Sequence, residues 1–304
     1  SGGQFWRDVY GGGYGSDDVP SIGTLTPATG TTPAVEVTPM QYAGGVEGNT
    51  TITVSGNAWI KKSVYGGGEM ASVGTIETAT QNGADYPFNI SWPYEFTYKD
   101  GTGKTSININ GGRIGITGKD YMGPWDANGN PIVYDNNGVA HIYDLSSYEY
   151  DEARQDNGDI FGAGKGKAGD RYAMAYLNNV KESNVTINYA TNTATPANYK
   201  DKVNGVYTHD CITGAVYGGA ENGHVNGNAN ITLTKGLVGH AIYGGGKGKG
   251  TYKPTPSSAE TYSLTAGKVY GNTYVTVNAT SNDSAYVVRS IFGGGNFGSL
   301  GVGN

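Results

Sequence analysis

Residues 216–246 read VYGGAENGHVNGNANITLTKGLVGHAIYGGG, so that VYGGA at Val216 returns as IYGGG at Ile242. The same pattern, a β-branched residue and an aromatic residue followed by glycines, begins at four more positions: Val9, Val64, Ile160 and Ile291. Its aromatic residue therefore stands at positions 10, 65, 161, 217, 243 and 292, with gaps of 55, 96, 56, 26 and 49 residues. A motif that recurs in this way indicates a stacked repeat protein.

The shortest gap predicts the length of one repeat unit, or rung, of the stack. It holds one alternating segment and one short strand that runs into the glycines. The alternating segment has five copies along the chain: GNTTITVSG (48–56), GKTSINING (103–111), SNVTIN (183–188), GNANITLTK (227–235) and GNTYVTVNA (271–279). Aligned, they give two aliphatic columns, of which the first is Ile52, Ile107, Val185, Ile231, Val275 and the second is Val54, Ile109, Ile187, Leu233, Val277. The interleaved positions carry Thr, Asn and Ser, so each strand has one aliphatic and one polar face.

This repeat predicts an all-β fold, a parallel β-helix or related β-solenoid with irregular and hairpin insertions. Stacked rungs would bring like residues into continuous ladders, with glycines at the corners. A β-propeller is the alternative, but its blades need four strands in about 40–50 residues, and the 26-residue gap is shorter than that.

We expect residues 1–304 to form a single repeat-built domain that is a segment of a longer protein. Two features favour a segment: the chain starts at Ser1 without an apolar leader, and a repeat motif stands close to its C-terminal end. The stretches without repeat columns are expected insertions, at about 69–101, 113–156, 189–208 and 251–265.

The composition excludes several classes of protein. Glycine accounts for 52 of the 304 residues, but 37% of the residues are hydrophobic and the glycines recur at fixed places, so the chain is not a disordered low-complexity segment. With a net charge of −6, the chain lacks the excess of basic residues that is typical of a nucleic-acid-binding protein. No apolar run is long enough for membrane insertion, and the single Cys211 excludes an internal disulfide.

No catalytic residue is predicted. The outward columns of the strands are Thr, Asn and Ser, whereas carbohydrate-active enzymes use paired carboxylates. His209, Asp210 and Cys211 are consecutive, so their side chains cannot all converge. A polysaccharide lyase or glycoside hydrolase of the parallel β-helix type is an alternative only if the insertions assemble the site.

Four aromatic residues in the insertions are candidates for binding a glycan: Trp92, Tyr94, Trp125 and Tyr134. Aromatic rings stack on sugar faces while nearby Asp and Asn side chains bond the hydroxyls. The alternative is that these rings only pack the insertions onto the solenoid.

No cofactor is predicted, with calcium as the one ion left open. Residues 12–19, GGYGSDDV, match a β-roll calcium pattern in which Asp17 and Asp18 would be the ligands. We call each of the six motifs that begin at Val9, Val64, Ile160, Val216, Ile242 and Ile291 a marker. The equivalent positions after the other five markers lack an aspartate, so no turn is expected to complete such a site. Lys165 and Lys247, each in a KGKG sequence after a marker, are expected at solvated corners.

The markers themselves predict a division of side chains between the two faces of a short strand. The β-branched residue should line the core and the aromatic should take the other face. We expect Tyr10, Tyr65, Tyr217 and Tyr243 to form a partly exposed stripe that contacts a ligand, unless a bulge turns them inward.

The VYGGG markers, the strand openings GNTT, GNAN and GNTY, and the many insertions resemble the large glycine-rich repetitive surface proteins of gut-type Bacteroidetes, which are adhesin-like. The resemblance implies secretion and display at the cell surface. It also implies O-glycosylation at an Asp-Ser/Thr-small/apolar sequence, and Asp283, Ser284 and Ala285 match that sequence, with Ser284 as the acceptor.

Together these patterns favour a non-catalytic extracellular module with a structural and adhesive role. Its expected partners are an extracellular glycan, a neighbouring cell-surface protein, or a second copy in end-to-end self-association. A self-assembling fibre subunit is the remaining alternative.

Overall fold

The computed structural model describes residues 3–15, 44–81, 94–116, 127, 132–134, 139–142, 158–169, 178–190, 193–203, 206–253, 257–263, 265–280 and 284–298. Within these residues the fold is all-β, without a helix. Most strands belong to four ladders of parallel strands, which we name the aromatic sheet, the long sheet, the side sheet and the corner ladder.

The aromatic sheet contains the six repeat markers. Each marker forms a two-residue strand, and the strands pair in parallel and in chain order. They are β2 (Val9–Tyr10), β5 (Val64–Tyr65), β12 (Ile160–Phe161), β17 (Val216–Tyr217), β20 (Ile242–Tyr243) and β25 (Ile291–Phe292). Because β-branched residue pairs with β-branched residue and aromatic with aromatic, every step keeps the same register.

The long sheet contains the alternating segments, as the sequence predicts. Its strands are β3 (Thr50–Val54), β8 (Lys104–Ile109), β14 (Glu182–Asn188), β19 (Ala229–Val238) and β23 (Thr273–Val277), again parallel and in chain order. Their register aligns the two aliphatic columns, for example Ile107 with Val185 and Val185 with Ile231.

Two shorter ladders close the cross-section. The side sheet consists of β1 (Gln4–Phe5), β4 (Trp59–Ile60), β9 (Arg113–Ile114), the bridging Ile212, residues 236–238 of β19, and β24 (Ala285–Val287). The corner ladder consists of Val46, Val73, β13 (Asn179–Val180), β18 (His224–Val225) and Val269.

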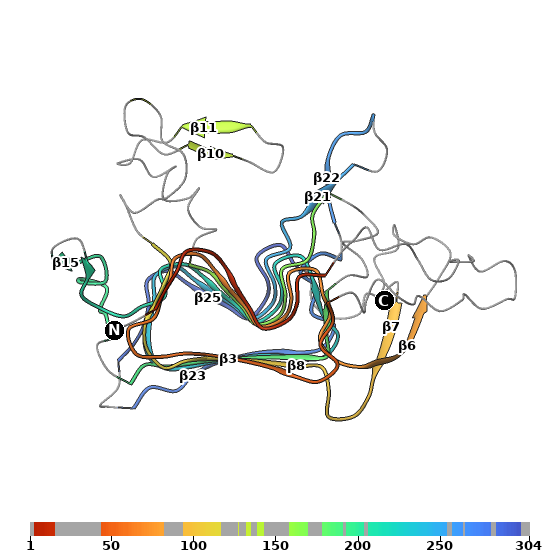
Figure 1. Ribbon diagram of the computed structural model, residues 1–304, viewed down its shortest axis with the longest axis horizontal. Helices are drawn as coiled ribbons and strands as arrows, with labels where there is room; N and C mark the ends of the chain where they lie inside the picture. Colours follow the sequence, from red (N-terminus) through yellow and green to blue (C-terminus); the bar gives the residue numbers. More distant parts are fainter. Residues whose placement is uncertain are drawn as a thin grey trace, which may run out of the picture.

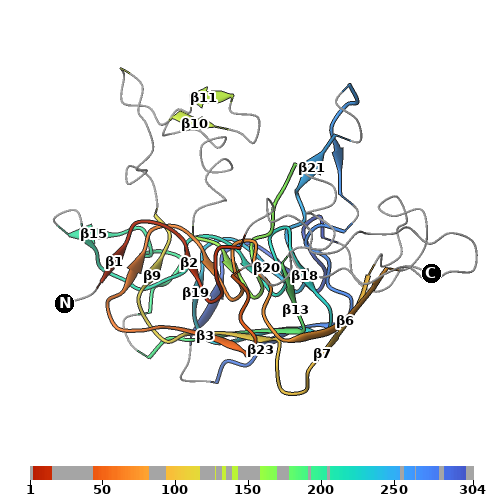
Figure 2. The ribbon, with the colours of Figure 1, turned by 45° about the vertical axis from the view of Figure 1, so that its right-hand side comes forward.

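The chain visits these ladders in one fixed order: aromatic sheet, corner ladder, long sheet, side sheet, aromatic sheet. The turn between Tyr217 and Tyr243 makes this circuit without an insertion, so 26 residues are one bare rung. Successive turns superpose in Figure 1, and Figure 2, turned by 45°, separates them. The arrangement is consistent with a β-solenoid. Propeller blades belong to the antiparallel architectures, whereas every stacked sheet here is parallel.

The described residues contain four antiparallel hairpins that leave the stack between ladders. They are β6 (Ile76–Gln81) with β7 (Tyr94–Tyr98), β10 (Ile132–Tyr134) with β11 (Ala140–Ile142), β15 (Lys202–Val203) with β16 (Val206–Tyr207), and β21 (Thr251–Tyr252) with β22 (Thr261–Tyr262). In Figure 1 they project above, to the left and to the right of the stack. Val73 and Arg113–Ile114 belong to stacked ladders, so the first two insertions begin later in the chain than the sequence suggests.

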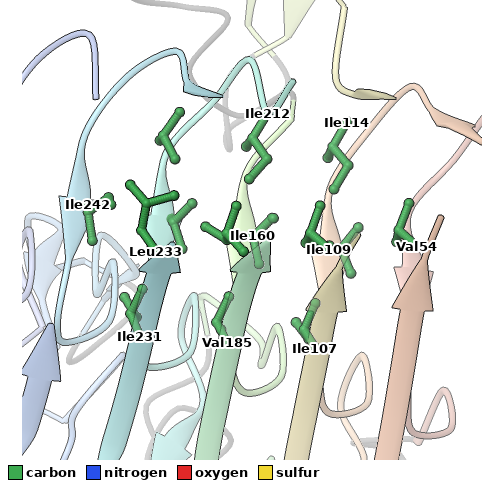
Figure 3. Close-up of a cluster of buried hydrophobic side chains, with 14 of the residues drawn as sticks. Val54, Ile107, Ile109, Ile114, Ile160, Val185, Ile212, Ile231, Leu233 and Ile242 are labelled. Atoms are coloured by element: carbon green, nitrogen blue, oxygen red, sulfur yellow. The ribbon is translucent and has the colours of Figure 1, made fainter. Parts of the chain in front are cut away.

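The core lies between the long sheet and the aromatic sheet. Figure 3 shows aliphatic side chains of adjacent turns in rows, among them Ile107, Val185 and Ile231. The β-branched marker residues Val64, Ile160, Val216 and Ile242 are fully buried there, as predicted. Val9 is only partly buried and Ile291 is 46% exposed, because among the described residues each has a neighbouring turn on one side only.

The first glycine after each aromatic residue allows successive turns to approach closely. A Cβ built on Gly11, Gly66, Gly162, Gly218 or Gly244 would overlap the carbonyl oxygen of the equivalent glycine on the next turn. None of these five has a positive φ, so the requirement is for space rather than for backbone freedom. At the last member of the column, Gly293, none of the described residues places an atom within 4 Å of such a Cβ.

We expect Gly162→Ala to destabilise the protein by about 3 kcal/mol, at the upper end of the usual cost of overpacking. The added methyl would meet a backbone oxygen, which has no alternative rotamer. Denaturant unfolding followed by far-UV circular dichroism measures the loss. Gly293→Ala is the matched control and should change the free energy of unfolding by less than about 0.5 kcal/mol. Equal losses in the two variants would contradict this explanation of the column.

Hydroxyl groups at the start of the long strands form a second column inside each turn. Thr50, Thr105, Ser183 and Thr273 donate from Oγ to the carbonyl oxygen of that first glycine, each at 2.6 Å. The fifth position of the column holds Ala229, which pairs in register with Ser183 and lacks the hydroxyl.

We therefore expect Ala229→Ser to stabilise the protein by about 1 kcal/mol, the usual net value of one hydrogen bond. Its hydroxyl would reach the carbonyl oxygen of Gly244, as that of Ser183 reaches Gly218. Ser183→Ala is the reverse variant and should cost about 1–2 kcal/mol. Urea unfolding measures both changes. A loss of stability in Ala229→Ser would contradict the prediction that a hydroxyl at position 229 bonds to the Gly244 carbonyl oxygen.

Candidate functional site

The aromatic residues of the markers form one continuous stack of rings. Neighbouring ring centroids along Tyr10, Tyr65, Phe161, Tyr217, Tyr243 and Phe292 lie 4.8–5.0 Å apart, with interplanar angles of 6–11°. Parallel strands are separated by about 4.7–4.9 Å, so the backbone spacing by itself holds the rings in contact. We call these six residues the aromatic ladder.

The expectation of a partly exposed tyrosine stripe is wrong for the middle of the ladder. Tyr65 and Tyr217 are only 4% and 3% exposed, while Tyr10 and Tyr243 are partly buried. The rings do leave the aliphatic core, since they form a separate cluster. However, each interior ring has both faces covered by its neighbours in the stack. A sugar ring therefore finds no free face on Tyr65 or Tyr217.

A column of alternating charges lies beside the rings. The residue four positions after the aromatic is Glu69, Lys165, Glu221 and Lys247 on four successive turns. Lys165 Nζ lies 2.8 Å from Glu69 Oε1, and Lys247 Nζ lies 3.8 Å from Glu221 Oε1. Partial burial acts to lower the pKa of Lys165, but the hydrogen bond and charge of Glu69 outweigh it and the pKa is raised.

Residues of this charged column contact the rings of the aromatic ladder. The Tyr65 hydroxyl donates to Glu221 Oε2 at 2.7 Å, and Lys247 Nζ lies 5.9 Å from the centroid of the Phe161 ring. Lys247 is buried rather than solvated, contrary to the sequence prediction, and its ammonium lies 3.7 Å from Oδ2 of the buried Asp159. The Lys247 ammonium is thus paired with two carboxylates of the fold itself.

Burial raises the pKa of Tyr65 and Tyr217 above the usual value of 10.0, and the charges of Glu221 and Asp159 add to the effect. A raised pKa in the folded state means stability that is present below pH 10 and is lost as the pH rises above it. We expect the free energy of unfolding to fall steeply above about pH 10. Tyrosinate absorbance at 295 nm should show only the exposed tyrosines titrating before unfolding. Titration of every tyrosine near pH 10 in the folded protein would contradict this.

One exposed aromatic residue that the sequence analysis did not select is Trp6. Its side chain is 53% exposed, at the first turn of the side sheet. The Lys61 ammonium lies 3.1 Å from the Trp6 ring centroid and 4.3 Å from that of Trp59. The Trp59 indole donates to the carbonyl oxygen of Gly115 at 3.0 Å. No sequence signal marks this contact, because it depends on the pairing of Phe5 with Ile60, which places Trp6 beside Lys61.

A polar cluster around Arg113 fixes the insertion that follows β14. The Arg113 Nη1 donates to the carbonyl oxygens of Tyr199 and His209 at 2.9 and 3.3 Å and to Cys211 Sγ at 3.2 Å. Burial raises the pKa of the Cys211 thiol to about 11, so it stays protonated at neutral pH and is a poor nucleophile. The His209 ring instead contacts Thr208 and Asn198.

The remaining predicted site residues are placed as follows. The backbones of Tyr94 and Tyr134 lie in hairpin strands β7 and β10. Ser284 is exposed just before β24, and its carbonyl oxygen accepts a hydrogen bond from the Gly236 N–H at 2.9 Å. Trp92, Trp125, Asp17 and Asp18 lie outside the described residues.

Among the residues that the structure describes, no three His, Cys, Asp or Glu side chains lie close enough together to hold a metal ion. The described part also contains no helix long and apolar enough to cross a membrane. No protein-family model matches the chain, and neither the curated proteins nor the solved structures include one with significant similarity to it.

Proposed function

We propose that this chain is a parallel β-helix with hairpin insertions that serves as a non-catalytic structural and adhesive module at a cell surface. The observation that carries the proposal is that charged and aromatic side chains of the stack contact one another within the fold. The aromatic ladder, the Glu/Lys column and Arg113 all pair within the fold. The stack therefore acts as a scaffold, and contact with an external glycan or protein falls to the insertions and to exposed aromatics such as Trp6.

The insertion after β9 is the first candidate for the contact surface. Its two ends meet at the stack, since a Cβ built on Gly115 would lie 2.6 Å from Gly158 Cα. It carries Trp125 and Tyr134, and such rings suit the stacking face of a sugar. An insertion that leaves and returns at one point can be removed without disturbing the rungs.

The test replaces residues 117–157 by a short Gly-Ser linker, which keeps the buried Ile116, and compares binding on a glycan array and to immobilised polysaccharides. We expect the parent chain to bind and the variant to lose binding with unchanged unfolding. As a matched control, an Asn-Gly turn replaces residues 253–260 and joins Tyr252 to Thr261, which pair in β21 and β22. Trp6→Ala tests the second exposed contact.

Two results would overturn the proposal. Absence of binding to every glycan and surface protein tested would remove the adhesive role. Release of reducing ends or unsaturated products from a polysaccharide panel would replace it by the alternative of a β-helix lyase or hydrolase.

A further inference from the structure

Three charged side chains of the stack meet beside the aromatic ladder. Lys247 Nζ lies 3.7 Å from Asp159 Oδ2 and 3.8 Å from Glu221 Oε1. The side chains of Lys247 and Asp159 are 6% and 1% exposed, and that of Glu221 is 21% exposed. They come from three consecutive turns, with Asp159 just before β12, Glu221 after β17 and Lys247 after β20. A lysine is thus held against a buried carboxyl group, with a second acid beside it.

Burial changes the chemistry that such a pair can undergo. An ion loses its hydration in the interior, and this loss favours a neutral amine and a neutral carboxylic acid, which differ from the ion pair by one proton transfer. A lysine amine in an apolar site is a nucleophile, and the Phe161 ring, 5.9 Å from the Lys247 Nζ, is part of that site. Exclusion of water also protects an amide formed there from hydrolysis.

The fixed geometry supplies the proximity that amide formation needs. Well-oriented groups within one molecule react at effective concentrations of about 10⁵–10⁸ M, from separations of about 3–3.5 Å between the reacting atoms. The 3.7 Å between Lys247 Nζ and Asp159 Oδ2 is close to that approach. Asp159 Oδ1 accepts a hydrogen bond from the Ala215 N–H at 2.8 Å, which fixes the carboxyl group and stabilises negative charge on this oxygen when an amine adds.

We propose that Lys247 and Asp159 condense to an intramolecular amide, a covalent bond between two turns that goes beyond the function proposed above. The ammonium passes a proton to Asp159, and the neutral amine then forms the Nζ–Cγ bond. Glu221 takes a proton from the nitrogen of the adduct and returns it to Oδ2, which leaves as water as the Cγ–Oδ2 bond breaks. One ammonium and one carboxylate become one amide and one water, without an oxidant or a cofactor.

The surroundings of the two acids distinguish their roles. Asp159 is the more deeply buried, and the Ala215 N–H holds its carboxyl group in place, so it is the electrophile. Glu221 is partly exposed, and its Oε2 accepts a hydrogen bond from the Tyr65 hydroxyl at 2.7 Å, which keeps it beside the amine as the proton carrier. The amide ties the β12 turn to the β20 turn across the β17 turn.

The experiment follows the mass of the full chain during refolding. The chain is dissolved in guanidinium, refolded by dilution, and sampled over time by intact-mass spectrometry. We expect the unfolded chain to have its full mass and the folded chain to lose one water. After trypsin digestion, residues 155–165 and 236–249 should appear as one linked peptide, because an acylated Lys247 is not cleaved. The unfolding comparisons that involve Lys247 apply to the chain before this bond has formed.

Two variants and one internal control test the roles of the groups. Lys247→Arg keeps the positive charge but forms no amide, so its mass should stay unchanged after refolding. Glu221→Gln keeps an acceptor for the Tyr65 hydroxyl but carries no proton, so bond formation should slow about a hundredfold. The Lys165–Glu69 pair has the shorter separation, 2.8 Å, but its side chains are 34% and 26% exposed, so it should remain an ion pair.

Three outcomes would overturn the inference. The parent chain would keep its full mass after far-UV circular dichroism shows that folding is complete; or the linked peptide would join Lys247 to Glu221 instead of Asp159; or Lys165 and Glu69 would form an amide as readily, which would remove burial as the cause. Loss of one water without a linked peptide would count as the first outcome, because it places the reaction within a single peptide.

Discussion

Phe161→Ala is expected to lower the free energy of unfolding by about 3–5 kcal/mol, the usual cost of emptying a large aromatic site in a core. Phe161 is 1% exposed, and its ring stacks between Tyr65 and Tyr217 with centroids 4.8 Å away on both sides. Removing it breaks the aromatic ladder in the middle and also takes away the ring beneath Lys247.

The measurement is guanidinium unfolding followed by near-UV circular dichroism, which reports the packing of the stacked rings. Phe292→Ala is the matched control, since it removes the same residue type from the open end of the same ladder, where one ring face and 46% of the residue surface are exposed. Its expected loss is about 1 kcal/mol. Similar losses in both variants would show that ring stacking between turns contributes little.

Lys247→Met should cost a comparable 3–5 kcal/mol, because it leaves a buried carboxylate without the countercharge of the lysine. The Asp159 side chain is only 1% exposed, and its Oδ2 lies 3.7 Å from the Lys247 ammonium. Its Oδ1 accepts from the Ala215 N–H at 2.8 Å, so the carboxylate cannot turn out to water without losing a backbone bond.

Asp159→Asn in the Lys247→Met background tests this explanation, since removing the second charge should restore most of the loss. Lys165→Met is the matched control in the same column. Its ion pair with Glu69 is 34% and 26% exposed, so its loss should be about 1 kcal/mol or less. A Lys247→Met deficit that is unchanged in the double variant would contradict a charge origin.

Much of the architecture was predictable from local patterns. The alternation in residues 229–234 and its four counterparts predicted the long sheet and its aliphatic columns, because period two allows only one division of faces. The columns are buried in the interior strands β8, β14 and β19, whereas Val277 at the end of the second column is 48% exposed. The 26-residue spacing from Tyr217 to Tyr243 gave the length of a bare rung. The β-branched marker residues of the four interior turns lie in the core as expected.

The candidate site was much less predictable. The sequence showed that Tyr65 and Tyr217 point away from Val64 and Val216, but it could not show that their own stacking would bury them. The charged column is spread over 179 positions of sequence, from Glu69 to Lys247. Its members form ion pairs only when the turns stack in register. Trp6 escaped notice for the same reason, since its partner Lys61 lies one turn away.

The sequence by itself determined the repeat, the faces of the strands and the places where backbones must approach, because these depend on neighbours within about ten residues or on a column of identical glycines. Only the tertiary structure decided which side chains of different turns meet. Insertions of differing length separate equivalent residues by 26 to 96 positions, so the pairing of Asp159 with Lys247 follows from how the turns stack in space.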